Sequence, residues 1–380
     1  MRISRSRLLV VAALAALLVM NVQAQDKKKG FFSIFKDSED GAFDMSDWLL
    51  NKKGFLVEPY MMTEPALGYG LGLACVWFHQ SMAEKKAPPS MTGVIGLATL
   101  NGTWGAGLFH VGHWKGDRIR FTGAVLKADL NVAFWGSGNI PIFSDRSINA
   151  AVDTWFLTVQ TTFRLGKSDF FAGARYEYMP VDIEFENPIE IPEFEGQHIK
   201  QAISEVSAVL AYDTRDNIFT PTKGFYLDLS GSYSDTWFGG EAAYGRIRFE
   251  GLGYFPATSR INVGARYETA FCLGDVPFWA RPWVDLRGAP QVKYQNKNTA
   301  TMEVEIDWNV SKRWSLLSFT GIGHAFEEFG EFDKGKTVRT IGAGWRYLLA
   351  RKLGLQWGMD FAFSQDDFAF YFVFGSGWMR

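Results

Sequence analysis

Residues 367–378 read DFAFYFVFGSGW, and this stretch decides the fold. Alternate residues of a β-strand point to the same side. One side of this strand is therefore almost wholly aromatic, while small residues and Tyr371 form the other. A soluble sheet could bury such a stripe, but a terminal strand that ends in an aromatic residue is also typical of a bacterial outer-membrane barrel. The aromatic positions are Phe368, Phe370, Phe372, Phe374 and Trp378, and we expect the four phenylalanines to face lipid.

The same alternation recurs along the chain from Gly54 onward. Between residues 302 and 308, for example, acidic residues alternate with large apolar ones. An even number of strands of about ten residues is the signature of a transmembrane barrel. We count sixteen segments, with approximate cores at 55–62, 69–79, 91–100, 104–113, 118–134, 154–164, 169–183, 203–213, 224–235, 241–254, 260–272, 299–309, 314–325, 337–349, 353–364 and 367–378.

The connections between these segments are sorted by length. Those after even-numbered segments are mostly tight, whereas several after odd-numbered segments are long: 135–153, 184–202, 273–298 and 326–336. Short turns at one rim and long loops at the other are typical of an outer-membrane barrel. The sequence therefore predicts an all-β chain, a transmembrane antiparallel β-barrel of sixteen strands over residues 54–380, with a short N-terminal extension.

The N-terminus predicts export. Residues 1–24 combine three arginines, an apolar run and small residues ending at Ala24, as in a secretory signal peptide. The apolar run is shorter than the roughly 20 residues that a membrane-spanning helix needs. We expect the protein in the bacterial outer membrane, in contact with its lipid and lipopolysaccharide. Residues 25–53 form a polar extension with a short helix around Trp48, either a periplasmic tail or a segment tucked into the barrel mouth.

Signals for chemistry or for nucleic-acid binding are weak. Loss of three arginines with the signal peptide would change the net charge from −2 to −5, which disfavours a nucleic-acid partner. The sequence has no nucleophile motif, zinc-binding helix motif or phosphate loop. His110 and His113 lie three positions apart, on opposite faces of a strand, and so make a poor metal pair. We expect no enzyme activity, no cofactor and no metal.

Two stretches are more specific than the general pattern. The first is YDTRDNIFTPTKGFYLDLSGS at 212–232, where two strands are joined by a turn. A proline stops the strand ladder, a glycine permits unusual backbone angles, and charged residues pin the turn through hydrogen bonds. The turn residues are Asp213, Arg215, Asp216, Pro221 and Gly224. The second stretch is RPWVDLRGAP at 281–290, with Arg287 and Gly288 shortly before the acidic strand 302–308.

Together with the terminal aromatic strand, these stretches resemble the BamA/TamA-type barrel, the bacterial surface antigen family. That family carries an Asp-x-Arg-Asp turn between its eighth and ninth strands and an Arg-Gly loop between strands eleven and twelve. The chain departs from it in three places. Residues 25–53 are too short for a periplasmic POTRA module. The acid usual in the thirteenth strand is absent from 319–323, which reads FTGIG, and Ala289 stands where an aromatic is usual.

The resemblance implies that loop 273–298 folds into the barrel and places Arg287 beside the acids of strand 302–308. Because the thirteenth-strand acid is missing, Glu305 is the preferred partner and Glu303 the alternative. It also implies a role in insertion or translocation of client outer-membrane proteins, through weak pairing between the first and last strands. A porin-like diffusion channel or transporter is the alternative function. An outer-membrane hydrolase is a third, disfavoured by the missing catalytic residues.

Overall fold

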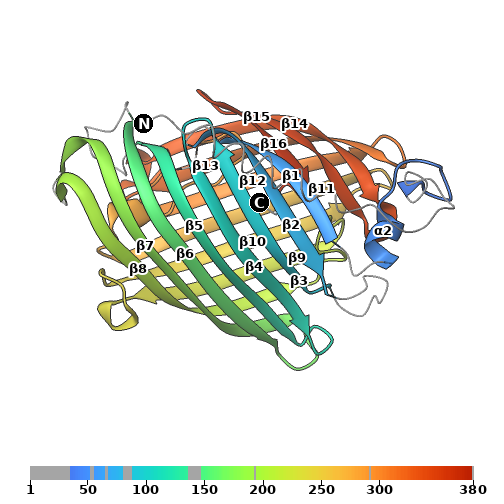
Figure 1. The fold of residues 1–380 in the computed structure, drawn as a ribbon, viewed down its shortest axis with the longest axis horizontal. Coiled ribbons are helices and arrows are strands. Elements are labelled where there is room, and N and C mark those ends of the chain that lie inside the picture. Colours follow the sequence, from blue (N-terminus) through green and yellow to red (C-terminus); the bar gives the residue numbers. More distant parts are fainter. Residues whose placement is uncertain are drawn as a thin grey trace, which may run out of the picture.

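A computed structural model describes residues 35–51, 55–64, 67–79, 88–135, 147–191, 194–290 and 292–378. The predicted signal peptide lies outside these residues. Sixteen strands form one sheet in which each strand is hydrogen-bonded to its neighbours in sequence. Every pairing is antiparallel, and the sheet curls into a nearly closed barrel (Figure 1). The predicted sixteen-stranded antiparallel barrel is confirmed.

The strands agree closely with the alternating segments of the sequence. They are β1 (Phe55–Glu64), β2 (Gly68–Phe78), β3 (Met91–Thr99), β4 (Trp104–Trp114), β5 (Ile119–Phe134), β6 (Ile148–Arg164), β7 (Phe170–Ile191), β8 (Phe194–Asp213), β9 (Gly224–Ser234), β10 (Tyr244–Pro256), β11 (Ile261–Gly274), β12 (Asn298–Asn309), β13 (Trp314–Phe326), β14 (Lys336–Ala350), β15 (Leu355–Phe363) and β16 (Phe368–Phe374). The short helices are α2 (Ser46–Asn51), η3 (Thr236–Phe238), η4 (Phe278–Ala280), η5 (Phe329–Lys334) and η6 (Arg351–Leu353). None of the described helices is long and apolar enough to cross a membrane.

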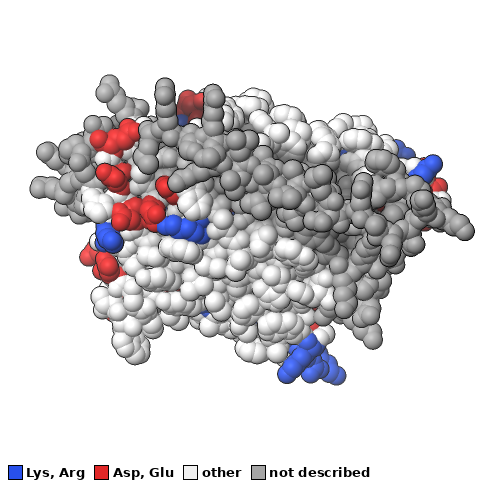
Figure 2. All heavy atoms as spheres, in the orientation of Figure 1, with Lys and Arg blue, Asp and Glu red and all other residues white. Residues whose placement is uncertain are grey.

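The outer wall of the barrel is apolar. Large side chains that a soluble protein would bury are exposed on strand after strand, among them Leu108, Leu210, Leu229, Ile306 and Ile341. Such an extensive apolar surface is typical of the outer wall of a transmembrane barrel. On the face drawn in Figure 2, charged side chains gather toward the two ends, and the described wall between them is uncharged.

Aromatic side chains flank the apolar wall at both rims, as expected where a barrel meets the membrane–water interface. One group lies at the end of the barrel where the connections follow even-numbered strands, which we call the short-turn end. The other group lies at the opposite end, where the connections follow odd-numbered strands, which we call the long-loop end. The exposed members at the short-turn end include Trp77, Trp114, Phe163, Phe225, Phe255, Trp308 and Trp314. At the long-loop end they include Tyr69, Trp104, Tyr233, Phe363 and Phe368.

Two of the predicted long loops are wrong in extent. Strand β6 begins at Ile148, so 148–153 is strand. Strand β7 continues to Ile191 and β8 begins at Phe194, so nearly all of 184–202 is strand. The reason is burial. Apolar residues of β5–β8 at this end of the barrel pack into one cluster with Phe278 of the β11–β12 loop: Phe134, Ala150, Val181, Ile183, Phe185 and Ile199.

The last strand is shorter than the aromatic alternation predicts. Strand β16 ends at Phe374, and Gly375 takes a left-handed backbone conformation with a φ of 74°. The chain turns inward there because Gly375 and Ser376 donate backbone hydrogen bonds to the carbonyls of Gln356 and Phe219, at 2.8 and 2.7 Å. Trp378 is consequently buried in the barrel interior, and the prediction that the strand and its alternation continue to Trp378 is wrong.

The first and last strands meet without a ladder. β16 lies beside β1 (Figure 1), but no backbone pairing joins them among the described residues, whereas every other neighbouring pair is hydrogen-bonded. We call this junction the seam.

The orientation of the wall is testable on strand β9. Leu229 is 44% exposed, midway between the rim aromatics Phe225 and Tyr233. Leu229→Lys should lower the free energy of unfolding by roughly 2–4 kcal/mol, since it places a charge near the bilayer midplane. The control Phe225→Lys, at the interface, should cost only about 0–1 kcal/mol. The measurement is the urea dependence of folding in lipid vesicles, and equal costs would contradict this orientation.

Candidate functional site

The loop between β11 and β12 lies inside the barrel. Its side chains are buried, although a loop at a barrel rim would ordinarily face water. The buried positions are Val276, Phe278, Ala280, Arg281, Val284, Leu286, Arg287, Ala289, Tyr294, Gln295 and Asn296. Val284, Leu286, Ala289 and Tyr294 pack with Ala325 and Val338 of β13 and β14. The structure thus describes an inward-folded loop.

Arg287 is the centre of this arrangement and the largest fully buried side chain among the described residues. Its Nε and Nη2 donate to Oε1 of Glu303 on β12, at 2.9 and 2.6 Å. Its Nη1 donates to Oδ2 of Asp360 on β15, at 2.7 Å. The guanidinium also lies 3.5 Å from the ring centroid of Phe319 on β13. One side chain therefore joins three strands of the wall.

The two acids proposed as partners both lie beside Arg287, in the reverse of the proposed order. Glu303 is fully buried and accepts two of its hydrogen bonds. Glu305 lies 2.7 Å from Nη1 and forms an ion pair with it, whereas the hydrogen bond from Nη1 goes to Asp360. Glu305 is also more exposed, with 16% of its side chain accessible.

Asp360 is the functional residue that the sequence reasoning missed. It is fully buried and accepts two hydrogen bonds from Arg346 of β14 as well, at 2.6 and 3.0 Å. It supplies a carboxylate in a barrel whose thirteenth strand has none. In β13 the stretch that lacks the acid has Gly321, where a Cβ would lie 2.7 Å from the Leu286 side chain of the loop. The only sequence signal was a lone acid in the alternation of 353–363.

Gly288 connects the loop to the last strand. Its backbone N–H donates to the Tyr371 hydroxyl of β16, at 3.0 Å. Its φ is 88°, and a Cβ there would lie 3.0 Å from the backbone of Ala362. Glycine is required because the loop backbone approaches the wall this closely.

The C-terminal turn reaches the same site. The indole Nε1 of Trp378 donates to Oε1 of Glu303, at 2.5 Å. The ring packs against Tyr254, with centroids 5.7 Å apart, and over Gly264, where a Cβ would stand 2.6 Å from it. Arg287, Glu303 and Trp378 thus tie the loop, β12 and the chain end together.

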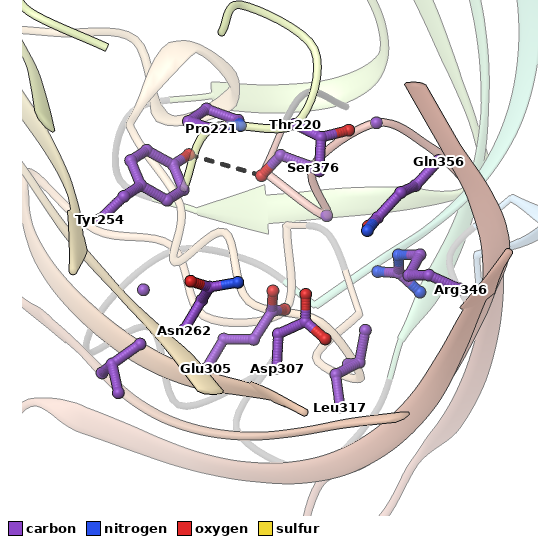
Figure 3. A pocket seen from close by; sticks show the side chains of 14 residues that line it. Thr220, Pro221, Tyr254, Asn262, Glu305, Asp307, Leu317, Arg346, Gln356 and Ser376 are labelled. Atoms are coloured by element: carbon purple, nitrogen blue, oxygen red, sulfur yellow. Dashed lines mark hydrogen bonds between the residues drawn. The ribbon is translucent and has the colours of Figure 1, made fainter. Parts of the chain in front are cut away.

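Figure 3 shows the space next to this cluster. Glu305, Asp307, Gln356 and Arg346 line it, and the Tyr254 and Ser376 hydroxyls lie 3.4 Å apart at its edge. Its volume of about 30 Å³ suits roughly two water molecules. The described residues present no group of three or more side chains suited to hold a metal ion.

The residues singled out at 212–232 pin the turn after β8. Asp213 accepts hydrogen bonds from Nε of Arg215 and Nη1 of Arg120, at 2.9 and 2.7 Å. Asp216 accepts from the backbone N–H groups of Thr222 and Lys223, at 2.9 and 3.1 Å.

Glycine and proline set the backbone of the same turn. Gly224 has a φ of 102°, and a Cβ there would stand 2.2 Å from the Thr214 carbonyl oxygen. Pro221 is buried there and borders the space in Figure 3. These residues fix the backbone of the turn at the short-turn end.

The role of Arg287 is testable by substitution. Arg287→Ala leaves Glu303 and Asp360 buried with one cation fewer, and should lower the free energy of unfolding by roughly 3–5 kcal/mol. Arg287→Lys should restore only part of this loss, because an ammonium lacks the planar fork. The readouts are thermal unfolding and protease cleavage within 275–297. The control Arg248→Ala removes a partly exposed arginine, which should matter little. Unchanged melting and cleavage in Arg287→Ala would contradict this role.

Comparison with known proteins finds barrels of similar fold. Residues 114–281 match the Omp85 superfamily domain. BamA from Haemophilus ducreyi, solved without POTRA domains 1–3, is similar in fold, with a TM-score of 0.55 and 13% identity; the match covers 85% of this chain and 70% of that one. No curated protein matches the sequence significantly.

Two CdiB barrels show the same likeness. CdiB from Escherichia coli has a TM-score of 0.58 at 9% identity, and CdiB from Acinetobacter baumannii 0.53 at 9%. Each match covers 84% of this chain, which spans 61% and 58% of those chains, less than two thirds of each. At such identities the likeness concerns the fold alone. The match of residues 114–281 to the Omp85 superfamily domain and the likeness in fold to the BamA and CdiB barrels agree with the predicted resemblance to BamA/TamA-type barrels.

Proposed function

We propose that the protein resides in the bacterial outer membrane and assists the insertion or translocation of outer-membrane proteins through the β1–β16 seam. The observation that carries this proposal is that the described residues of β1 and β16 form no ladder, whereas the other fifteen junctions of the barrel are hydrogen-bonded. Unpaired strand edges are templates for a further strand. A client strand could pair there without breaking an existing ladder.

The two edge strands support this role. β1 contains Pro59, which has no backbone N–H and is tolerated at sheet edges. β16 has only seven residues, and its ladder with β15 ends at Phe374. Both strands therefore offer few backbone hydrogen bonds to each other at the seam.

The barrel interior favours this function over free diffusion of solutes. Arg287 and its buried neighbours hold the β11–β12 loop across the interior. A cavity of about 290 Å³ remains near the short-turn end, bordered by Arg120, Arg215, Glu250 and Trp378. A porin needs a continuous water-filled path, which such a loop would obstruct.

The seam is tested by cross-linking it. In a chain with Cys75 and Cys272 replaced by Ala, cysteines at Val57 of β1 and Phe372 of β16 would be joined by a flexible bis-maleimide. The protein would be reconstituted in vesicles and given an unfolded outer-membrane barrel protein. Cross-linking should reduce protease-protected client roughly to the level of empty vesicles, since a client strand cannot enter a closed seam.

The matched control joins Phe361 and Phe370, which oppose each other on β15 and β16. That link tethers the same edge strand but leaves the seam free, so insertion should continue. Equal activity of the seam-linked and control-linked proteins would contradict insertion through the seam.

Conductance separates the porin alternative. In planar bilayers the intact protein should give small, flickering currents, because the loop occupies the interior. Deletion of 280–292 should raise the conductance several-fold, whereas shortening the rim loop 327–335 should not. A large, steady conductance of the intact protein would instead favour a diffusion channel.

A further inference from the structure

The N-terminal segment 35–51 is bound to the short-turn end of the barrel, and the proposed function does not use it. Its anchors are the β12–β13 and β14–β15 turns, which belong to the β16 side of the seam. The segment then leads through residues 52–54 into β1, which forms the other side. In Figure 1, α2 lies at this end of the barrel, near β14 and β1.

The first anchor is Arg313 in the β12–β13 turn. Its Nε lies 2.6 Å from Asp40, its Nη1 2.5 Å from Asp44 and its Nη2 3.0 Å from Asp37. Asp37, Asp44 and Arg313 are buried. Three carboxylates around one guanidinium are a specific clasp, because every side of the arginine fork has a partner.

The second anchor is the β14–β15 turn. The backbone N–H of Met45 donates to the Leu349 carbonyl at 2.8 Å. The N–H groups of Arg351 and Lys352 donate to the Asp44 carboxylate and the Ser46 hydroxyl, each at 3.0 Å. The segment is therefore attached through its backbone as well as its charges.

An apolar cluster spans the seam from this segment. Leu49 of α2 is 1% exposed. It belongs to a cluster with Leu56 of β1 and Val76 and Phe78 of β2 on one side, and Ala350 and Leu355 of β14 and β15 on the other. Phe374 of β16 packs against the same cluster. Helix α2 at the short-turn end thus provides apolar side-chain contacts across the seam, where backbone hydrogen bonds between β1 and β16 are missing from the described residues.

We propose that residues 35–51 form a strap that crosses the seam at the short-turn end and holds β1 against β14–β16. Opening of the seam then requires that the aspartates of the strap leave Arg313 and that Leu49 leaves its apolar cluster. The strap therefore resists opening of the seam. A partner that removes residues 35–51 from the rim would also free β1. It goes beyond the proposed function, since it concerns what holds the seam closed.

The clasp predicts a pH dependence. Hydrogen bonds from Arg351 and from the Glu39 backbone lower the pKa of Asp37, and the bond from Arg313 lowers that of Asp40. Burial raises the pKa of Asp44, but bonds from Ser46 and Arg313 outweigh it, so this pKa is lowered too. Other facing groups are Glu39, Asp47, Lys352 and the Tyr347 hydroxyl.

Because the pKa values of these three aspartates are lower in the folded state, the clasp adds stability at pH values above the unfolded-state pKa of about 3.9. The stabilisation disappears as the pH falls further, through the folded-state pKa values. The strap should therefore stay bound at about pH 5 and detach well below about pH 4.

The test compares Arg313→Gln with Lys312→Gln, which removes an exposed charge from the same turn. Backbone hydrogen exchange would be followed for the full chain in lipid nanodiscs without a client. Arg313→Gln should speed exchange in 46–51, 55–64 and 368–374 roughly tenfold. Lys312→Gln should leave it unchanged. Leu49→Ala, which keeps every charge of the clasp, should also speed exchange at the seam.

The outcome that overturns the strap is faster exchange in the β12–β13 hairpin alone, or no change at the seam in both Arg313→Gln and Leu49→Ala. Either result would leave insertion through the seam untouched, because no client is present. Spin labels on cysteines at Asp47 and Lys352, with Cys75 and Cys272 replaced by Ala, provide the pH readout. Their distance should stay short at pH 5 and lengthen at pH 3; an unchanged distance at pH 3 would overturn the role of the aspartates.

Discussion

The fully buried Arg287 and its ion pairs determine how the interior of this barrel is arranged. Removing the Arg287 guanidinium from water is costly unless carboxylates compensate it. Glu303, Glu305 and Asp360 do so from two different strands. These contacts fix the β11–β12 loop in the interior, and the loop then carries Gly288 to Tyr371 of the last strand. The loop, the wall and the edge of the seam are consequently parts of one network.

The sequence alone predicted the barrel, because alternation of side chains is a local property of a strand and survives in every segment. It failed where distant groups decide the outcome. Trp378 continues the aromatic period, but the left-handed turn at Gly375 and the hydrogen bond to Glu303 draw it inside. Strands β7 and β8 extend into expected loop because their apolar faces meet Phe278, about 80–100 positions later in the chain.

The ion pairs were harder still to predict. An acid missing from β13 suggested that Arg287 would rely on β12 alone, yet Asp360 comes from β15, 73 positions away. Arg313 and Asp40 are separated by 273 positions, and nothing in either local pattern marks them as partners. Both pairings depend on barrel closure, which brings β12, β15 and the N-terminal segment to adjoining places. Closure itself was predictable, but the strand offsets that decide which charges meet were not.

The same closure explains how an unpaired seam can persist. β16 is attached through Tyr371 and the C-terminal turn to the interior, and β1 follows the N-terminal segment that is bound to the β12–β13 and β14–β15 turns. Leu56 of β1 and Phe374 of β16 also meet in the apolar cluster around Leu49. A hydrogen-bonded junction would lose its ladder residue by residue on opening, whereas these attachments lie at the interior and at one rim. Their release frees an edge strand and leaves the other fifteen junctions intact. The physical cost of opening is thereby concentrated in a few charged and apolar contacts, away from the lipid-facing wall.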